Sequence, residues 1–177
     1  MKKKKIYLLF FIILLINPCF SQFSGGAYVG MFHGFRDGFD TQYGVNATAK
    51  YDFNNLRIGG NIGYYVSSED TPIMKTSRYT TPLSAAVEYV FLQKDFYPEL
   101  KTIKPHVGLE LGIYRMGIIT SIGSSSTRNF GGGPTAGALM RFSKHFVVDA
   151  LLKYHFIFQK DSNLSAVSTK IGFLYYF

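Results

Sequence analysis

The chain lacks the residues that most secreted domains use for stabilisation. Its only cysteine, Cys19, lies in a segment that we expect to be removed, so the mature protein has no internal disulfide. Tryptophan is absent, and beyond that segment no apolar run reaches the length of a membrane-spanning helix. Helical periodicity is also weak. These absences exclude a disulfide scaffold and a helical membrane protein.

The first 21 residues have the pattern of a secretory signal peptide. A basic start, MKKKK, precedes an apolar run from Ile6 to Ile16, and Cys19 and Ser21 supply the small residues of a cleavage site before Gln22. A lipoprotein that is lipidated on Cys19 is the alternative, but Pro18 stands where a small residue is expected. We therefore expect a signal peptide at 1–21 and one domain at 22–177.

The basic charge of the chain belongs partly to this signal. The chain has 19 basic and 11 acidic side chains. Four of the basic ones are lysines of the signal, so the mature chain would carry a net charge of +4. A charge of that size on an exported protein is poor support for nucleic-acid binding. We expect no nucleic-acid partner.

What the chain does contain is two-residue alternation in eight segments. In residues 43–53, for example, Tyr43, Val45 and Tyr51 share an apolar face, and Asn46 and Thr48 lie on the opposite face. The other segments are 25–35 (with Ala27, Val29 and Met31 on the apolar face), 56–66, 79–91, 106–114, 133–142, 146–156 and 169–177. Strands of about ten residues can cross a hydrocarbon layer when they are tilted.

The connections between these segments alternate in length. Short turns occur at DFNN and FSKH, and longer polar loops occur at 36–41, 67–77, 115–129 and 159–163. Short turns at one end and long loops at the other are typical of an outer-membrane barrel. The stretch 92–104 is long where a tight turn is expected, and we interpret it as a docking segment.

Alternation alone does not say which face is outside, because a soluble lipocalin-like barrel alternates as well. The polar face here is rich in Gly, Ala, Ser and Thr, which suit a narrow lumen better than a water-facing surface. Aromatic residues stand near the ends of the apolar face, where membrane barrels carry their girdles. We therefore predict an all-β, eight-stranded, antiparallel up-and-down transmembrane β-barrel, with its apolar face toward lipid.

The last segment ends on alternating aromatic residues, Phe173, Tyr175 and Phe177. This ending resembles the C-terminal signal by which the barrel-assembly machinery recognises bacterial outer-membrane barrels. Together with the signal peptide and the eight strands, it resembles the small outer-membrane barrels of the OmpA, OmpX and OmpW kind, without the periplasmic domain of OmpA. The resemblance implies a multi-pass protein of the outer membrane, whose partners are lipids, lipopolysaccharide and, during biogenesis, the assembly machinery.

Charged residues occur in the polar phase of most strands. Because isolated charges in a narrow lumen are costly, they should form an interior network. The network is expected to contain Lys50, Asp52, Arg57, Glu88, Glu110, Arg141, Asp149, Lys153 and Lys170. It could act as a gate or ion path, or as a structural plug, as the OmpA-like resemblance implies. Small residues around Gly63, Thr80, Gly112 and Gly133 suggest an outward-opening pocket above it.

Catalytic signatures are missing. The lipid A deacylase barrels place a Ser two residues after a His, and none of His33, His106, His145 or His155 has one. No His/Cys cluster has metal-ligand spacing, so we predict neither catalytic residues, a metal nor a cofactor. Three functions stay open: a non-enzymatic envelope barrel that contacts a protein partner through its loops or residues 92–104, a narrow or gated channel for ions or small apolar molecules, and a lipid A-modifying enzyme.

Overall fold

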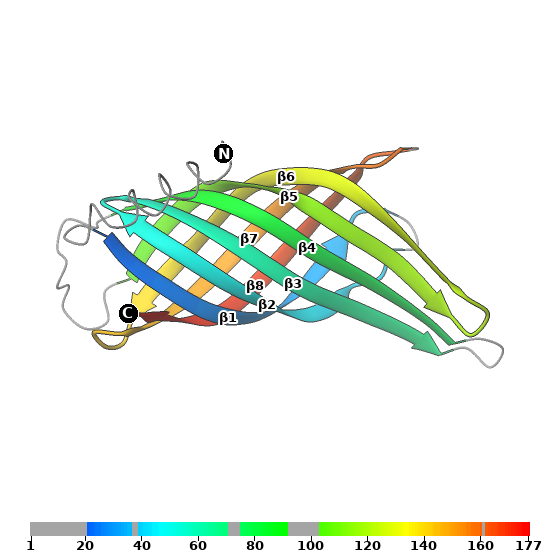
Figure 1. The fold of residues 1–177 in the computed structure, drawn as a ribbon, viewed down its shortest axis with the longest axis horizontal. Coiled ribbons are helices and arrows are strands. Elements are labelled where there is room, and N and C mark those ends of the chain that lie inside the picture. The colour runs from blue at the N-terminus through cyan, green and yellow to red at the C-terminus, as the bar shows by residue number, and fades with distance from the viewer. Residues whose placement is uncertain (1–20, 37–38, 71–74, 92–102, 161) are drawn as a thin grey trace, which may run out of the picture.

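The computed structural model describes residues 21–36, 39–70, 75–91, 103–160 and 162–177, which form one closed barrel (Figure 1). Antiparallel strands follow one another in chain order, and β8 returns to pair with β1. The strands are β1 (Ser21–Gly34), β2 (Gln42–Phe53), β3 (Leu56–Asp70), β4 (Lys75–Val90), β5 (Ile103–Thr120), β6 (Ser124–Arg141), β7 (Phe146–Phe158) and β8 (Leu164–Tyr176). This confirms the predicted eight-stranded, up-and-down β-barrel.

The alternation in the sequence separates an outer face from a lumen. Val45, Leu83 and Leu109 are at least 59% exposed on the outside, whereas Lys50 and Glu88 are each 2% exposed inside. An apolar outer surface of this extent is unfavourable in water and favourable in contact with the hydrocarbon chains of lipid. The lipid-facing interpretation is therefore confirmed. Among the residues that the structure describes, no helix is long and apolar enough to cross a membrane.

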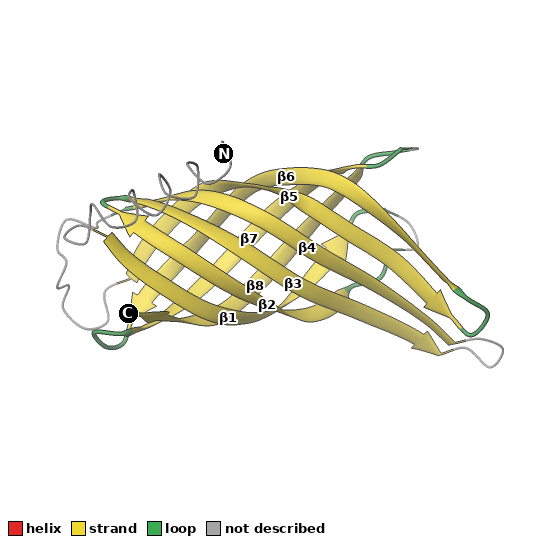
Figure 2. Cartoon of the chain, viewed as in Figure 1, coloured by secondary structure: helices red, strands yellow, loops and turns green. Residues whose placement is uncertain are grey.

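Strand lengths differ from the prediction at one end of the barrel. Residues 115–129, expected to be a loop, are mostly a paired hairpin, because β5 and β6 each have 18 residues (Figure 2). Residues 67–70 likewise pair with 75–78 and do not form a loop. Both hairpins are rich in Ser, Thr and charged residues and extend beyond the apolar belt. Apart from Met116, most of their residues are exposed or half-exposed on both faces, so no alternation marks them in the sequence.

The opposite end has the tight turns that were expected. At the β2–β3 turn, Asn54 has a φ of 52°, a left-handed conformation that Asn tolerates better than most residues. Following the rule for outer-membrane barrels, the short-turn end faces the periplasm and the long hairpins face outward. The expected docking stretch 92–104 and the signal peptide fall almost entirely outside the described residues.

Close approach of β2 and β3 leads to a testable prediction. A Cβ built on Gly44 would lie 2.0 Å from the Tyr64 carbonyl oxygen and 2.7 Å from the Tyr65 Cα, and neither backbone atom can rotate away. We expect Gly44→Ala to lower the free energy of unfolding by about 1–3 kcal/mol, as overpacking does. Urea unfolding in lipid vesicles would measure it. Gly60→Ala is the matched control, since its Cβ would meet no atom closer than 4.0 Å; equal losses in both variants would contradict the steric argument.

Candidate functional site

The lumen of the barrel holds a layer of buried ion pairs near its periplasmic end. Lys50 on β2 reaches across the lumen and contacts two carboxylates, Glu88 on β4 at 3.1 Å and Asp149 on β7 at 3.2 Å. All three side chains are no more than 2% exposed. Because buried charges are stable only when they are paired, this lysine holds β2, β4 and β7 together.

A second group of contacts adjoins Lys50 and its partners. Arg57 donates two hydrogen bonds to Asp52, of 2.6 and 3.0 Å, in the bidentate geometry that makes guanidinium–carboxylate pairs strong. Arg57 also donates to the hydroxyl of Tyr176 at 2.6 Å, and Tyr176 donates to Asp52 at 2.9 Å. Tyr176 lies near the end of β8, so this triangle connects the last strand to β2 and β3.

Asp149 is the most connected carboxylate of this layer. Besides the contact with Lys50, its carboxylate accepts hydrogen bonds from the Tyr28 hydroxyl at 2.6 Å and from Nε2 of His106 at 3.0 Å. Nδ1 of His106 lies 3.7 Å from Glu88. Four strands, β1, β2, β5 and β7, therefore converge on this single buried side chain.

A second charged layer lies nearer the middle of the lumen. Lys153 on β7 forms a short ion pair with Glu110 on β5, which also accepts a hydrogen bond from Asn61. Lys170 on β8 donates to the Asn46 side-chain oxygen at 2.9 Å. Its ammonium also lies 5.6 Å from the centroid of the Tyr65 ring, within cation–π range.

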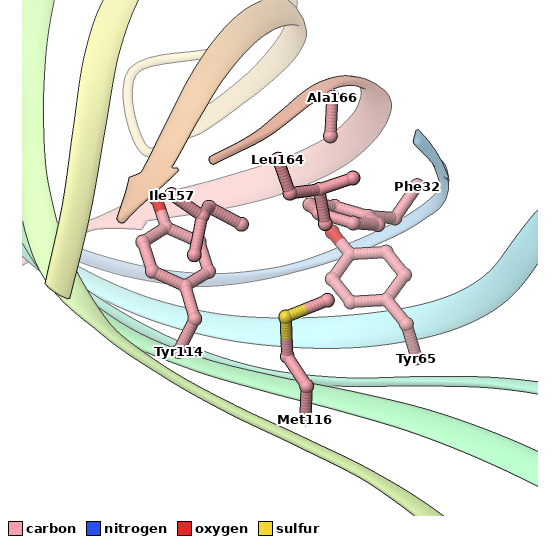
Figure 3. Packing of buried hydrophobic residues seen from close by; sticks show 7 residues of the cluster. All are labelled: Phe32, Tyr65, Tyr114, Met116, Ile157, Leu164 and Ala166. Atoms are coloured by element: carbon pink, nitrogen blue, oxygen red, sulfur yellow. The ribbon is translucent and has the colours of Figure 1, made fainter. Parts of the chain in front are cut away.

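Apolar side chains form one cluster on each side of the charged layers. We call the outer group the aromatic roof: it gathers side chains from β1, β3, β5, β7 and β8, namely Phe32, Tyr65, Tyr114, Met116, Ile157, Leu164 and Ala166 (Figure 3). The inner group lies at the periplasmic end and comprises Tyr28, Val90, Leu139, Val147, Leu174 and Tyr176. Charges in such surroundings are shielded from water, which makes their pairing more important.

Glycines make room for these bulky interior side chains. Six large interior residues each face a glycine across a strand pair, among them Lys50 with Gly59 and Tyr65 with Gly44. The same holds for the pairs Tyr28–Gly172, Lys170–Gly30, Glu88–Gly108 and His106–Gly137. A Cβ at any of these glycines would lie within 3.0 Å of neighbouring atoms. The glycines of the polar face therefore provide space for the interior network.

The expected pocket beside Gly63, Gly112 and Gly133 is not found at that level. A Cβ on Gly63 would lie 2.3 Å from Asn46, and one on Gly112 would lie 2.6 Å from Ser84. Tyr65 and Tyr114, which the polar-face pattern places inward, occupy the lumen there. A pocket lies farther out, above the aromatic roof, and of the expected residues only Thr80 lines it.

The structure places eight of the nine expected network residues in the buried lumen, where each has a charged or polar partner. Those eight are Lys50, Asp52, Arg57, Glu88, Glu110, Asp149, Lys153 and Lys170. Arg141 differs: it is half-buried near the periplasmic end, with its guanidinium carbon 5.1 Å from the Tyr176 ring centroid. Phe173, Tyr175 and Phe177 face outward, at 67%, 40% and 75% exposure.

The sequence patterns did not predict a buried series of hydrogen bonds centred on His155. His155 on β7 bonds to Ser168 on β8 through Nε2 at 2.8 Å and to the Tyr114 hydroxyl through Nδ1 at 2.9 Å. The search for a Ser two residues after a His on one strand could not find a pair that spans two strands. A hydroxyl beside an oriented His is the minimal nucleophilic arrangement. Here, however, Ser168 is 1% exposed and, unlike Gln42 and Thr80, is not among the residues that line the pocket at the outer mouth.

No arrangement in the described part of the chain suits a metal ion, since no group of three or more His, Cys, Asp or Glu side chains is suitably placed. The carboxylates of the lumen face lysines and arginines at the distances given above.

Comparison with known proteins supports the fold and not a specific activity. No family model and no curated protein matches the chain. Among solved structures, Neisserial surface protein A (NspA) matches with a TM-score of 0.66 at 17% identity, over 89% of this chain and 97% of that one. Ail of Yersinia pestis, in complex with the heparin analogue sucrose octasulfate, matches with a TM-score of 0.58 at 17% identity, over the same shares.

The N-terminal β-barrel domain of Pseudomonas aeruginosa OprF gives a TM-score of 0.56 at 17% identity, over 88% of this chain and 99% of that domain. All three are small outer-membrane barrels. Their fold, together with the apolar outer face of this barrel, places the chain in the bacterial outer membrane. The chain has the fold of the small eight-stranded outer-membrane β-barrels.

Proposed function

We propose that this chain is a non-enzymatic, integral outer-membrane barrel with a closed lumen, which acts as a structural or interaction protein of the envelope. One observation supports the proposal: two layers of buried ion pairs lie along the lumen between two apolar clusters. A barrel of eight strands is just wide enough for side chains to fill it.

Interaction would then take place outside the lumen. The apolar outer face contacts membrane lipids, and lipopolysaccharide is the outer-leaflet partner of barrels in this location. The hairpins β3–β4 and β5–β6 offer polar surface beyond the membrane. Ail was crystallised with a heparin analogue, which supports ligand binding by this barrel as well. The stretch 92–104 remains a proposed contact for a periplasmic partner, and the assembly machinery a proposed partner during biogenesis.

A specific observation favours a second candidate, a narrow or gated ion path. Several buried polar atoms along the described lumen have no hydrogen-bond partner: Ser24 Oγ, Arg57 Nη1, His106 Nδ1 and Thr135 Oγ1. Such atoms are usually satisfied by water. A continuous file of water between the charged layers would let small ions pass, whereas isolated waters would not.

Conductance of the refolded barrel in planar bilayers separates the two candidates. For the closed barrel we expect no current steps in concentrated KCl, under conditions in which a general porin prepared in parallel conducts. The Glu110→Gln variant should then also give no current steps. Reproducible steps in the wild type, with an amplitude that Glu110→Gln changes, would contradict closure and establish the ion path.

A further inference from the structure

A pocket opens at the outer mouth of the barrel, directly above the aromatic roof. It has a volume of about 420 Å³, within the range of small-molecule sites. Its walls come from the outer ends of β4, β5 and β6 and from residues next to β1, β2 and β7. The roof closes it below, since Met116 belongs to both and Phe39 packs against Phe32 with ring centroids 5.8 Å apart. A molecule could therefore enter from outside without passing through the lumen.

Two buried polar atoms of this pocket have no hydrogen-bond partner among the residues that the structure describes. They are Oε1 of Gln42 and Oγ1 of Thr80, whose residues are 1% and 0% exposed. Gln42 begins β2 beside Phe32, and Thr80 on β4 pairs with Met116 on β5, so both lie at the level of the roof. Because buried polar atoms are almost always hydrogen-bonded, Gln42 Oε1, which can only accept, indicates a bound group with an N–H or O–H donor. The Thr80 hydroxyl can donate or accept, so it indicates a polar atom of either kind in the same group.

The charges around the pocket indicate the sign of that group. Arg36 and Arg78 line it, and no carboxylate does among the lining residues that the structure describes. Arg78 forms an ion pair with Asp40 at 3.2 Å, which fixes its guanidinium at the wall. A planar guanidinium has five N–H donors, so it can bind one carboxylate while it contacts another. The pocket therefore suits an anion.

The remaining lining is largely apolar, from Phe39, Tyr79, Met116 and Ile118. We propose that the pocket binds a compact organic acid with an apolar body and an amide N–H, such as an N-acylated amino acid. In this arrangement the carboxylate of the ligand lies against Arg36 and Arg78, and its apolar body contacts the aromatic roof. The amide N–H of the ligand donates to Gln42 Oε1, and the Thr80 hydroxyl donates to the amide carbonyl of the ligand. This inference goes beyond the proposed function, because it holds whether or not the lumen conducts.

Binding of N-acetyl-L-phenylalanine and N-hexanoylglycine to the full folded chain in phospholipid nanodiscs tests the proposal. Ligand-observed NMR titration should give saturable binding for both. Thr80→Val and Arg78→Gln should each weaken it about tenfold, since each removes a hydrogen bond, in one case a charged one. Arg128→Gln is the matched control, an exposed arginine of the same end that does not line the pocket. The methyl esters of both probes should bind at least tenfold more weakly than the acids.

Loss of binding in Thr80→Val cannot be mistaken for misfolding. Valine has the shape of threonine, and removing an unpartnered buried hydroxyl should leave the urea midpoint unchanged or raised. Three results would each overturn the proposal: no saturation by either acid, equal affinity of acids and esters, or unchanged affinity in both Thr80→Val and Arg78→Gln.

Discussion

A Lys50→Met variant should lose about 3–5 kcal/mol of unfolding free energy, the usual cost of removing one partner from a buried ion pair. Lys50 is the cation between Glu88 and Asp149, and all three are no more than 2% exposed. Methionine retains most of the volume of lysine and removes only the charge. Two carboxylates that share one ammonium would then face each other in an apolar lumen, and their repulsion adds to the lost attraction.

Urea unfolding in lipid vesicles would measure this loss. Far-UV circular dichroism is the suitable signal, because the chain has no tryptophan. Lys144→Met, an exposed lysine in the β6–β7 turn, is the matched control and should change stability by less than about 0.5 kcal/mol. The double variant Lys50→Met/Glu88→Gln should recover part of the loss, since it removes one of the two carboxylates that lose their ammonium.

The size of the Lys50 effect also bears on the two candidate functions. A loss below about 1 kcal/mol is typical of pairs that water screens. That result would contradict the dry, closed lumen and would favour the ion path. A full loss with partial recovery in the double variant would mean that the charged layer is a structural plug.

Much of the interior could be predicted from the sequence because alternation assigns each residue to a face. Once Val45 and Tyr51 are placed outward, Lys50 and Asp52 must point inward, and the turn at Asn54 sets the height of Arg57 across the strand pair. The same logic places Glu88 and Asp149 near the periplasmic end. Face and height thus follow from local pattern and turn position.

Which interior side chains contact one another across the lumen could not be predicted in this way. Lys50 contacts Asp149, 99 residues away and on a strand that is not its neighbour, because strand tilt and stagger determine which side chains meet across the lumen. The His155–Ser168 pair depends on the β7–β8 register, and Gln42 lies at a strand boundary without alternation. Long hairpins such as β5–β6 escape detection for a related reason, since both of their faces are wet.

A Phe177→Ala variant should be depleted from the outer membrane of cells while it refolds normally in the test tube. The backbone N–H of Phe177 donates to the Phe23 carbonyl at 3.1 Å, and alanine keeps this bond. The ring is 75% exposed and contacts the rings of Phe23 and Tyr175, at centroid distances of 5.7 and 5.2 Å. An aromatic contact of that kind contributes about 0.5–1.5 kcal/mol, too little to prevent folding.

The C-terminal aromatic residues resemble an assembly signal, so the main effect of removing the ring should be on recognition. β8 must pair with β1 before the barrel is closed, because lipid cannot satisfy an open strand edge. Immunoblots of outer-membrane fractions, compared with refolding yields in vesicles, would separate recognition from stability. Phe158→Ala is the matched control: its ring is 56% exposed and stacks on Phe130 at the outer end of the barrel. If both variants reach the membrane at wild-type levels, Phe177 is a lipid-facing aromatic residue without a role in recognition. If only Phe177→Ala is depleted from the outer membrane while both variants refold equally, the assembly machinery recognises the Phe177 ring.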